Sequence, residues 1–401
     1  MTAHDKHFDE KQAAAVLKHA VLSNYIYPFG SMTSLTNTDR RAWFIDAYAG
    51  AGRFKDGEPG SPLIALGAAA ALAKHKDPRD LRCIFIERDK NNFSALQATI
   101  SADYPSATPT LIQGSAEAHL GTAMTQVGSE PVLTFLDPFG ASLPRELMVE
   151  KLLKRSGGGV SEVLLNFHVF TIARIGPYAR NEAGLNEADK KTLQRLDTFL
   201  GYQDWRDLFL KLYQQGVTGS ALSAALAVAD DYRNRVTKET GYAAFPVDVR
   251  RSAREEPRFQ LTLFYKKGTP AEYKFADAAA RANAKWRKRI SEDEAKKDGT
   301  NFAGALEGLG LEYSQAAFEA DWAANEAKLE KEWHDQLRSN IHALISSAPL
   351  PLQGNVARFF GTTLGLASET HLRKAWNGLA KEGHIQPFPA RATHCAILTK
   401  A

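Results

Sequence analysis

The segment W-F-I-D-A-Y-A-G-A-G-R, from Trp43 to Arg53, combines residue types that can hold a cofactor. An apolar run ends in Asp46, and Gly50 and Gly52 follow in a short loop. Glycine lets the backbone turn sharply and approach a ligand closely, because it has no Cβ atom. Loops of this kind follow the first strand of nucleotide-type cofactor sites. A tight strand-to-helix turn without a ligand is the alternative that this segment leaves open.

A second acid, Glu87, ends the apolar run L-R-C-I-F-I-E. A carboxylate at this place can accept both hydroxyls of a ribose; a surface ion pair with Arg88 or Lys90 is the alternative. The spacing from Asp46 to Glu87 is about twice the roughly 20 residues expected in a dinucleotide site, and the third glycine of that fingerprint is missing. Both features argue against nicotinamide. Together with the motif D-P-F-G at 137–140 and an antiparallel hairpin at the end of the predicted sheet, they favour S-adenosylmethionine, whose methionyl amine Asp46 would orient.

A third motif, Asp137-Pro138-Phe139-Gly140, follows the apolar run V-L-T-F-L. It resembles the D-P-P-Y and D-P-F-G tetrads of methyltransferases that modify exocyclic amines of adenine or guanine. The exocyclic amine of a nucleobase is a weak nucleophile, because its lone pair is delocalised into the ring. A carboxylate and a backbone carbonyl that accept its N–H bonds localise that pair, and an aromatic ring can stack on the base. We therefore predict a catalytic role for Asp137, Pro138 and Phe139. A turn that caps the next helix, with Phe139 in the core, is the alternative.

Other residues near these motifs complete the predicted site. In addition to Asp46, Gly50, Gly52 and Glu87, the expected cofactor contacts are Tyr48, Ala49, Ser115 and Ala116. The expected contacts to substrate or nucleic acid are Arg53, Ser61, Asn166, Arg373 and Lys374. His168 and Arg174 follow the same strand as Asn166 and can face the same edge. Neither the histidines nor the two distant cysteines show metal-ligand spacing, so we expect no metal.

Strands and helices alternate over the first part of the chain. A helix is expected over 12–27, strands over 43–47, 81–87, 110–113, 131–136 and 161–170, and helices starting at Ser61 (as N-cap), Asn91 and about Glu117. This alternation predicts a parallel α/β sheet with both faces covered. A helical insertion at about 186–240 precedes two strands, 242–250 and 258–267, whose short connection makes them antiparallel. A terminal antiparallel hairpin is typical of the Rossmann-like sheet of class I methyltransferases.

The sequence suggests a methyltransferase-like domain over 1–290, a helical linker over 291–329 and a winged helix-turn-helix domain over 330–401. In the last region three helices and two short strands, around I-Q-P-F-P and H-C-A-I-L-T, form the expected pattern. Its recognition helix would present Arg373 and Lys374 to phosphates, although winged helices also bind proteins. The basic cluster 285–289 is a second candidate nucleic-acid contact or simply a solvated helix face.

The segment D-A-Y-A-G-A-G-R-F-K-D-G-E-P-G-S-P-L-I-A-L, with F-I-E-R-D, F-L-D-P-F-G and L-L-N-F, resembles the signature of the three-Cys-motif partner protein family. The resemblance covers about residues 10–290. It implies a methyltransferase-like fold and, from the family's name, a neighbouring protein with a three-cysteine motif as partner. The first segment is also similar to that of an adenine methyltransferase acting on large-subunit ribosomal RNA, which has D-P-P-Y where this chain has D-P-F-G.

Composition sets outer limits on function. The 401 residues are 44% hydrophobic and carry a formal net charge of only +4, so the overall charge does not indicate a polyanionic partner. The polar start lacks a signal peptide, no apolar run is long enough for a bilayer, and two distant cysteines suit the cytoplasm. We expect a methyltransferase acting on an exocyclic base amine of RNA or DNA. A non-catalytic protein of the same fold that binds nucleic acid or a partner is the alternative, and an oxidoreductase is a weaker one.

Overall fold

The computed structural model describes residues 13–138, 140–155, 157–214, 221–250, 256–305 and 314–401. The chain forms two compact units. The first takes in Tyr25–Arg250 and the strand that ends before Gly268, and the second takes in Ala13–Asn24 and Gly268–Ala401. Helix α10 (Ala271–Ala305) is thus grouped entirely with the second unit. The expected domain boundaries near residues 290 and 330 stay predictions.

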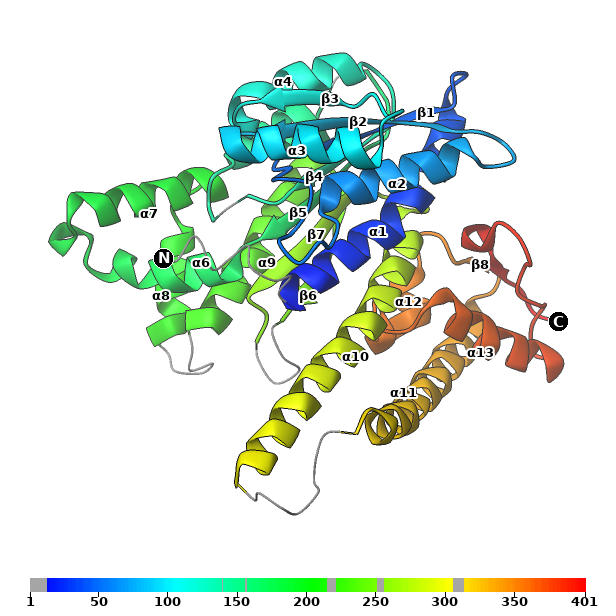
Figure 1. Ribbon diagram of the computed structural model, residues 1–401. Coiled ribbons are helices and arrows are strands. Elements are labelled where there is room, and N and C mark those ends of the chain that lie inside the picture. The colour runs from blue at the N-terminus through cyan, green and yellow to red at the C-terminus, as the bar shows by residue number, and fades with distance from the viewer. Residues whose placement is uncertain (1–12, 139, 156, 215–220, 251–255, 306–313) are drawn as a thin grey trace. The chain divides into compact units, whose positions relative to one another are not determined.

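The first unit is built around a seven-stranded sheet of order β3-β2-β1-β4-β5-β7-β6 (Figure 1). Its strands are β1 (Arg41–Asp46), β2 (Asp80–Glu87), β3 (Thr110–Gln113), β4 (Val132–Leu136), β5 (Ser161–Phe167), β6 (Tyr242–Val249) and β7 (Phe259–Lys266). Strands β1 to β5 run parallel, whereas β7 pairs antiparallel with both β5 and β6. The predicted mainly parallel sheet with a terminal antiparallel hairpin is confirmed.

Helices cover both faces of this sheet (Figure 1). One face carries the C-terminal half of α1 (Ala13–Thr33), α2 (Ser61–Ala73) and α3 (Lys90–Asp103). The Tyr25 hydroxyl of α1 donates a hydrogen bond of 2.6 Å to the buried Glu162 of β5. Close packing of α1 on α2 explains Gly30, because a Cβ atom there would lie 2.6 Å from Leu72 Cδ1.

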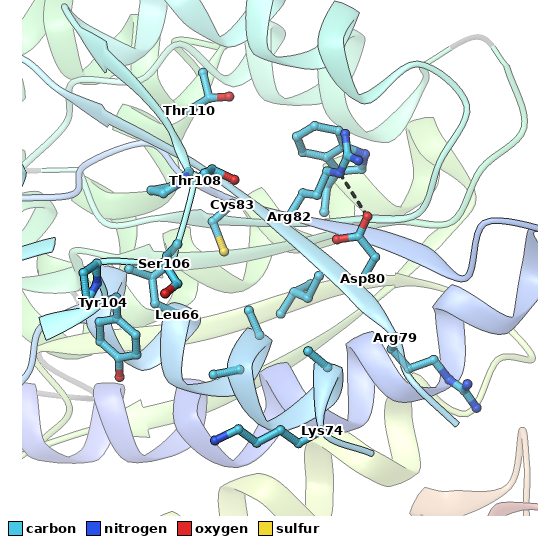
Figure 2. A pocket seen from close by; sticks show the side chains of 18 of the residues that line it. Leu66, Lys74, Arg79, Asp80, Arg82, Cys83, Tyr104, Ser106, Thr108 and Thr110 are labelled. Atoms are coloured by element: carbon cyan, nitrogen blue, oxygen red, sulfur yellow. Dashed lines mark hydrogen bonds and ion pairs between the residues drawn. The ribbon is translucent and has the colours of Figure 1, made fainter. Parts of the chain in front are cut away.

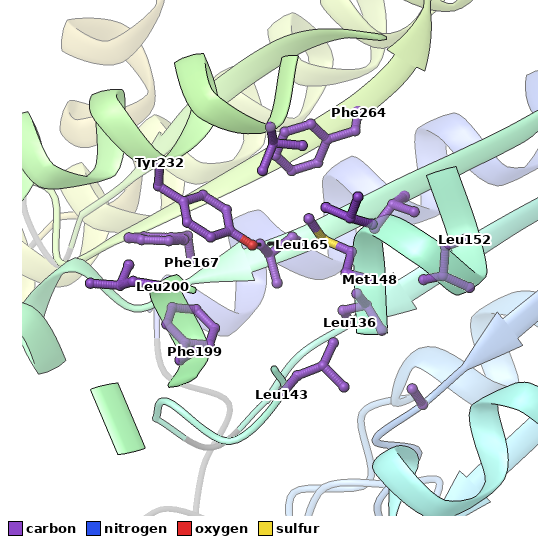
Figure 3. Packing of buried hydrophobic residues seen from close by; sticks show 14 of the residues in the cluster. Leu136, Leu143, Met148, Leu152, Leu165, Phe167, Phe199, Leu200, Tyr232 and Phe264 are labelled. Carbon is purple, nitrogen blue, oxygen red and sulfur yellow. Dashed lines mark hydrogen bonds between the residues drawn. The ribbon is translucent and has the colours of Figure 1, made fainter. Parts of the chain in front are cut away.

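The opposite face carries α4 (Ala116–Val127), α5 (Arg145–Leu147), the π-helical segment η3 (Met148–Leu153) and a helical region after β5. Alternate β5 residues Leu165 and Phe167 point into this layer, as the two-residue period of a strand requires (Figure 3). The Phe167 ring centroid lies 5.4 Å from that of Phe199 and 5.0 Å from that of Tyr232. An aromatic core therefore holds the helical region on the sheet.

That region comprises α6 (Val169–Ile175), the 3₁₀ segment η4 (Gly176–Gly184), α7 (Glu187–Leu200), α8 (Trp205–Gln214) and α9 (Ala221–Thr240). Helices α7, α8 and α9 occupy the region at about 186–240 where the sequence suggests a helical insertion. The fifth strand was predicted three residues too long, because β5 ends at Phe167 and His168 is the N-cap of α6. The apolar residues Val169 and Phe170 continue the pattern of the strand, but they form the first turn of a helix.

The starts of the helices after β1, β2 and β3 place polar groups near the site. The Asp89 carboxylate accepts the backbone N–H groups of Asn91 and Asn92, each at 2.9 Å, and Ser115 caps α4. The prediction of Ser61 as N-cap was wrong, since Gly60 is the cap of α2. Ser61 is the first helical residue and is buried.

The second unit contains α10, α11 (Gln315–Leu344), α12 (Val356–Phe360), α13 (Glu369–Lys381), β8 (Leu350–Pro351) and β9 (Ile397–Leu398). Its core includes Trp376, stacked on Phe359 with ring centroids 5.6 Å apart. Of the two short strands expected at the end of the chain, the second is present as β9, which pairs with β8. The first is not a strand, and its Ile385 forms an isolated antiparallel bridge to Lys400. In the described parts of the chain, no helix has the length and apolar character needed to cross a membrane.

Candidate functional site at the carboxyl edge of the sheet

The carboxyl ends of β1, β2 and β4 bring three predicted acids together. The chain crosses over in opposite directions from the central strands β1 and β4, and ligands bind in open α/β sheets at the carboxyl ends of strands where the order reverses in this way. The pKa of Asp46 is raised to about 7, mainly by burial and in smaller part by the negative charges of Asp137 and Glu87. These three carboxylates thus share one electrostatic environment, as the sequence predicted from their positions at strand ends.

Asp46 is fully buried and only half satisfied. Its Oδ1 atom accepts the backbone N–H of Tyr48 at 3.1 Å, whereas Oδ2 has no hydrogen-bond partner among the described residues. The Ser61 hydroxyl and the Tyr48 amide lower its pKa, but less than burial raises it. A buried acceptor without a donor is costly, and an ammonium group would satisfy it. The orphaned oxygen therefore fits the methionyl amine of the expected cofactor.

Glu87 holds the glycine loop in place through a hydrogen bond. Its side chain is buried, with Oε2 accepting the N–H of Gly50 at 2.7 Å and Oε1 accepting that of Asp89 at 2.6 Å. The alternative of a surface ion pair with Arg88 or Lys90 does not hold for this buried, amide-bound carboxylate. Each carboxylate oxygen has a second lone pair, so Glu87 can still accept two ribose hydroxyls.

The glycine loop leaves room in front of its backbone. Gly50 and Gly52 have φ values of +65° and +85°, which side chains rarely adopt. A Cβ atom at Gly50 would meet nothing within 4 Å, so open space lies before the loop. The N–H of Ala49 donates to the Ile86 carbonyl at 3.0 Å and ties the loop to β2. Such an open, fixed backbone suits the close approach of a ligand.

The other predicted residues of this edge have structural partners of their own. The Tyr48 hydroxyl lies 3.5 Å from Ser142 Oγ, and Ser115 Oγ accepts the N–H of Ala118 at 3.3 Å. Ala116 is buried in the first turn of α4. Arg53, expected to contact substrate, forms an ion pair of 2.8 Å with Asp103 of α3. The loop after Gly52 is therefore pinned to α3.

Asp137 is held by its neighbour on β5. The Asn166 side-chain amide donates a hydrogen bond of 2.6 Å to Asp137 Oδ1. The parallel register that pairs Leu136 with Leu165 places the next residues of both strands side by side. The Asn166 Oδ1 atom is buried without a hydrogen-bond partner among the described residues. Pro138 is buried, and Phe139 lies outside the described residues.

The predicted phosphate contacts of the second unit are partly engaged by its own acids. Arg373 donates to Glu369 at 2.8 Å, and its guanidinium carbon lies 5.7 Å from the ring centroid of Phe388. Lys374 is exposed on the same helix, α13. Arg373 therefore contributes to the packing of this unit, and Lys374 is better placed to meet a phosphate.

The basic cluster on α10 is similarly neutralised. Arg287, Lys288 and Arg289 form ion pairs with Glu326, Glu319 and Asp293 at 2.5, 2.8 and 3.1 Å. Trp286 is buried and does not present its ring for stacking on a base. Most of this cluster serves the helix packing of the second unit.

Two other features lie away from the acids. Across the described ranges, no group of three or more His, Cys, Asp or Glu side chains is arranged to hold a metal ion. A cavity of about 770 Å³ opens beside the amino-terminal halves of β2 and β3, near Arg82, Cys83 and Thr110 (Figure 2). It shares no residue with the predicted site, because the acids stand at the opposite ends of these strands.

The strand order, with β7 antiparallel to both of its neighbours, is that of a class I, Rossmann-like methyltransferase fold, and the C-terminal region is helical. No family model matches the chain. No curated protein shows significant similarity to it either.

Several solved structures are distantly similar. Trm1 from Pyrococcus horikoshii, in complex with S-adenosyl-L-methionine, is 10% identical over 66% of this chain and 58% of its own, with a TM-score of 0.32. The small RNA methyltransferase HEN1 is 11% identical over 61% of this chain and 26% of its own, with a TM-score of 0.30. PKMT2 from Rickettsia typhi is 12% identical over 77% and 73%, with a TM-score of 0.30.

This chain spans less than two thirds of the length of the Trm1 and HEN1 structures. With TM-scores this low, these similarities identify no specific family.

Proposed function

We propose that this protein is an S-adenosylmethionine-dependent methyltransferase that acts on an exocyclic base amine of RNA or DNA. The observation that carries the proposal is the buried Asp46 carboxylate with its unpartnered Oδ2, at the same edge as Glu87 and Asp137. Three carboxylates at one edge of the sheet favour a ligand with positive charges, and the expected cofactor has an ammonium and a sulfonium group. The resemblance to three-Cys-motif partner proteins agrees with this fold.

Different residues of the chain would bind different parts of the cofactor. Asp46 would accept the methionyl ammonium, Glu87 the two ribose hydroxyls, and the open backbone at Gly50 the middle of the ligand. When bound, S-adenosylmethionine supplies an electrophilic methyl group. Ser115 and Ala116 follow β3 at the edge where the adenine would lie.

Asp137 would act on the substrate amine. Its carboxylate accepts an N–H bond and so localises the lone pair of the nitrogen; it can also take up the proton that the nitrogen loses. The 2.6 Å hydrogen bond from Asn166 fixes the carboxylate in one orientation, which favours a single position of the amine. Asn166 is therefore a positioning residue in this proposal.

Calorimetric titration of S-adenosylmethionine into the purified protein tests the first half of the proposal. We expect binding in the micromolar range, and weaker binding by Glu87→Gln, which keeps the size of the side chain but loses an acceptor. Asp207→Ala, an exposed acid on α8, is the matched control and should bind as wild type does. Absence of binding at millimolar cofactor would refute the proposal.

Transfer of a labelled methyl group to total RNA and DNA tests the second half. We expect Asp137→Ala to bind the cofactor but to transfer the label about 10²- to 10⁴-fold more slowly, the range for loss of a general base. Wild-type protein that binds the cofactor yet labels no nucleic acid would favour the non-catalytic alternative.

A further inference from the structure

We propose that the carboxyl end of β5 carries a docking platform for a single-stranded polynucleotide, next to Asp137. The platform consists of Phe170 and Arg174 on α6 and Arg258 just before β7. This proposal rests on the proposed function and deepens it, because it names the surface that would hold the nucleic-acid strand beside the target base. All three residues belong to the first unit.

Phe170 stands out as an aromatic ring on the surface. Its side chain is 46% exposed in the first turn of α6. Single exposed hydrophobic residues are common, so exposure alone indicates no ligand. Here, however, the guanidinium carbon of Arg258 lies 5.2 Å from the ring centroid. A ring beside a cation is the combination that proteins use to stack a nucleobase and hold its phosphate.

Two contacts fix the segments that carry these side chains. The backbone N–H of Phe170 donates to the carbonyl oxygen of Arg258 at 3.0 Å. The ring of His168 packs edge-on against Phe259, with centroids 4.6 Å apart. Because the start of α6 is joined to the start of β7 twice, the platform exists before any ligand arrives, which lowers the entropic cost of binding.

The platform is close to the predicted catalytic carboxylate. Asn166, which holds Asp137, precedes Phe170 by four residues, and four residues of chain span at most about 14 Å. An enzyme that acts on a base amine must draw its target base out of the stack. The bases next to the target then lose a stacking partner, and an exposed aromatic ring within this distance can replace it.

Charge at the platform suits a phosphate backbone. Arg174 follows Phe170 by four residues, so both lie on the same face of α6. It is exposed and forms no ion pair among the described residues. The Arg258 guanidinium beside the ring adds a second positive charge to the platform. A strand is therefore favoured over a neutral or cationic ligand.

Fluorescence anisotropy with 5′-fluorescein-labelled single strands of about 12 nucleotides, one RNA and one DNA of the same mixed sequence, tests this proposal. We expect Phe170→Ala to weaken binding about 5- to 100-fold, and Phe170→Trp to retain it. Arg174→Ala should reduce the slope of log affinity against log salt by about 0.7. Leu35→Ala and Lys74→Ala, on exposed side chains near the amino ends of β1 and β2, should bind as wild type does.

A stacking signal separates the platform from any other nucleic-acid contact of the chain. The indole fluorescence that Phe170→Trp introduces should be quenched when an unlabelled strand binds, beyond the quenching of wild-type protein. Binding by Phe170→Ala within about twofold of wild type, or no added quenching, would overturn the proposal. Titration of S-adenosylmethionine into the same samples keeps the two proposals apart. Wild-type protein that does not bind the cofactor would refute the proposed function. The effect of Phe170→Ala on strand binding would still decide the docking platform.

Discussion

At the scale of single residues, the site depends on how a few carboxylates are satisfied. Glu87 receives two backbone N–H groups, and Asp137 receives the Asn166 amide, but Asp46 is buried with one oxygen unpaired among the described residues. Burial penalises the charged form of such a group, and so the pKa of Asp46 rises to about 7. A cation beside the carboxylate would reverse that shift.

The pH dependence of cofactor binding follows from Asp46. Only the ionised carboxylate attracts an ammonium group, so affinity for S-adenosylmethionine should rise between pH 6 and 8, by up to about tenfold per pH unit below the pKa. Calorimetry at pH 6, 7 and 8 measures this, and the binding should release protons. In Asp46→Asn the affinity should be lower and nearly independent of pH. A wild-type affinity that falls as pH rises would contradict this role.

At the scale of elements, the packing of α1 on β5 includes a second buried acid. Glu162 is almost fully buried on β5, and burial raises its pKa to about 7, against the hydrogen bond from Tyr25 that lowers it. The folded state therefore holds a proton that the unfolded state releases at a lower pH. Stability from this group is fully present below the ordinary pKa of glutamate and is lost as pH rises toward 7.

Glu162→Gln tests this linkage. Glutamine keeps an acceptor for the Tyr25 hydroxyl but does not titrate. We expect the free energy of unfolding of the variant, relative to wild type, to increase by about 2–3 kcal/mol between pH 5 and pH 8. Urea denaturation at the two pH values provides the measurement, with the exposed Glu146→Gln as control. A relative stability that does not change with pH would show that Glu162 ionises without a penalty from burial.

At the scale of the whole molecule, the chain forms two compact units, and the predicted site lies in the first. The first contains the sheet, the acids and the platform, whereas the second contains α10 to α13 and the short β8–β9 sheet. Among the described residues of the second unit, eight lysines and arginines form ion pairs with acids. The Glu369 carboxylate, for example, contacts Lys274 at 3.1 Å, Arg373 at 2.8 Å and the Thr393 hydroxyl at 2.9 Å. Its surface is therefore less basic than its lysines and arginines suggest.

Glu369→Ala should destabilise the second unit by about 2 kcal/mol, because it removes charge-assisted hydrogen bonds and leaves Lys274 and Arg373 without their acid. Differential scanning calorimetry measures the change. Cofactor affinity, which depends on the first unit, should stay the same. Glu382→Ala, at an exposed ion pair with Arg338, is the matched control and should change little. Equal stability of Glu369→Ala and wild type would contradict the assigned role.

Much of the fold is encoded locally. Apolar runs that end in Asp46, Glu87 and Asp137 are sufficient to predict parallel strands with acids at one edge, since the carboxyl ends of such strands lie together. The short connection after β6 likewise predicts an antiparallel partner. Errors occur where local patterns are ambiguous: the residues after Phe167 look like strand but begin α6, and Gly60 caps α2 in place of Ser61.

The sequence by itself determined the mainly parallel sheet with its terminal antiparallel hairpin, the identity of the acids and the glycine loop, because periodicity and residue type are local properties. Only the tertiary structure decided which of these groups is buried, which is satisfied and which is left unpaired. The Asn166–Asp137 hydrogen bond joins residues 29 positions apart, and Phe170 meets Arg258 across the whole helical insertion. Such contacts depend on how distant segments pack, and no short stretch of sequence encodes them.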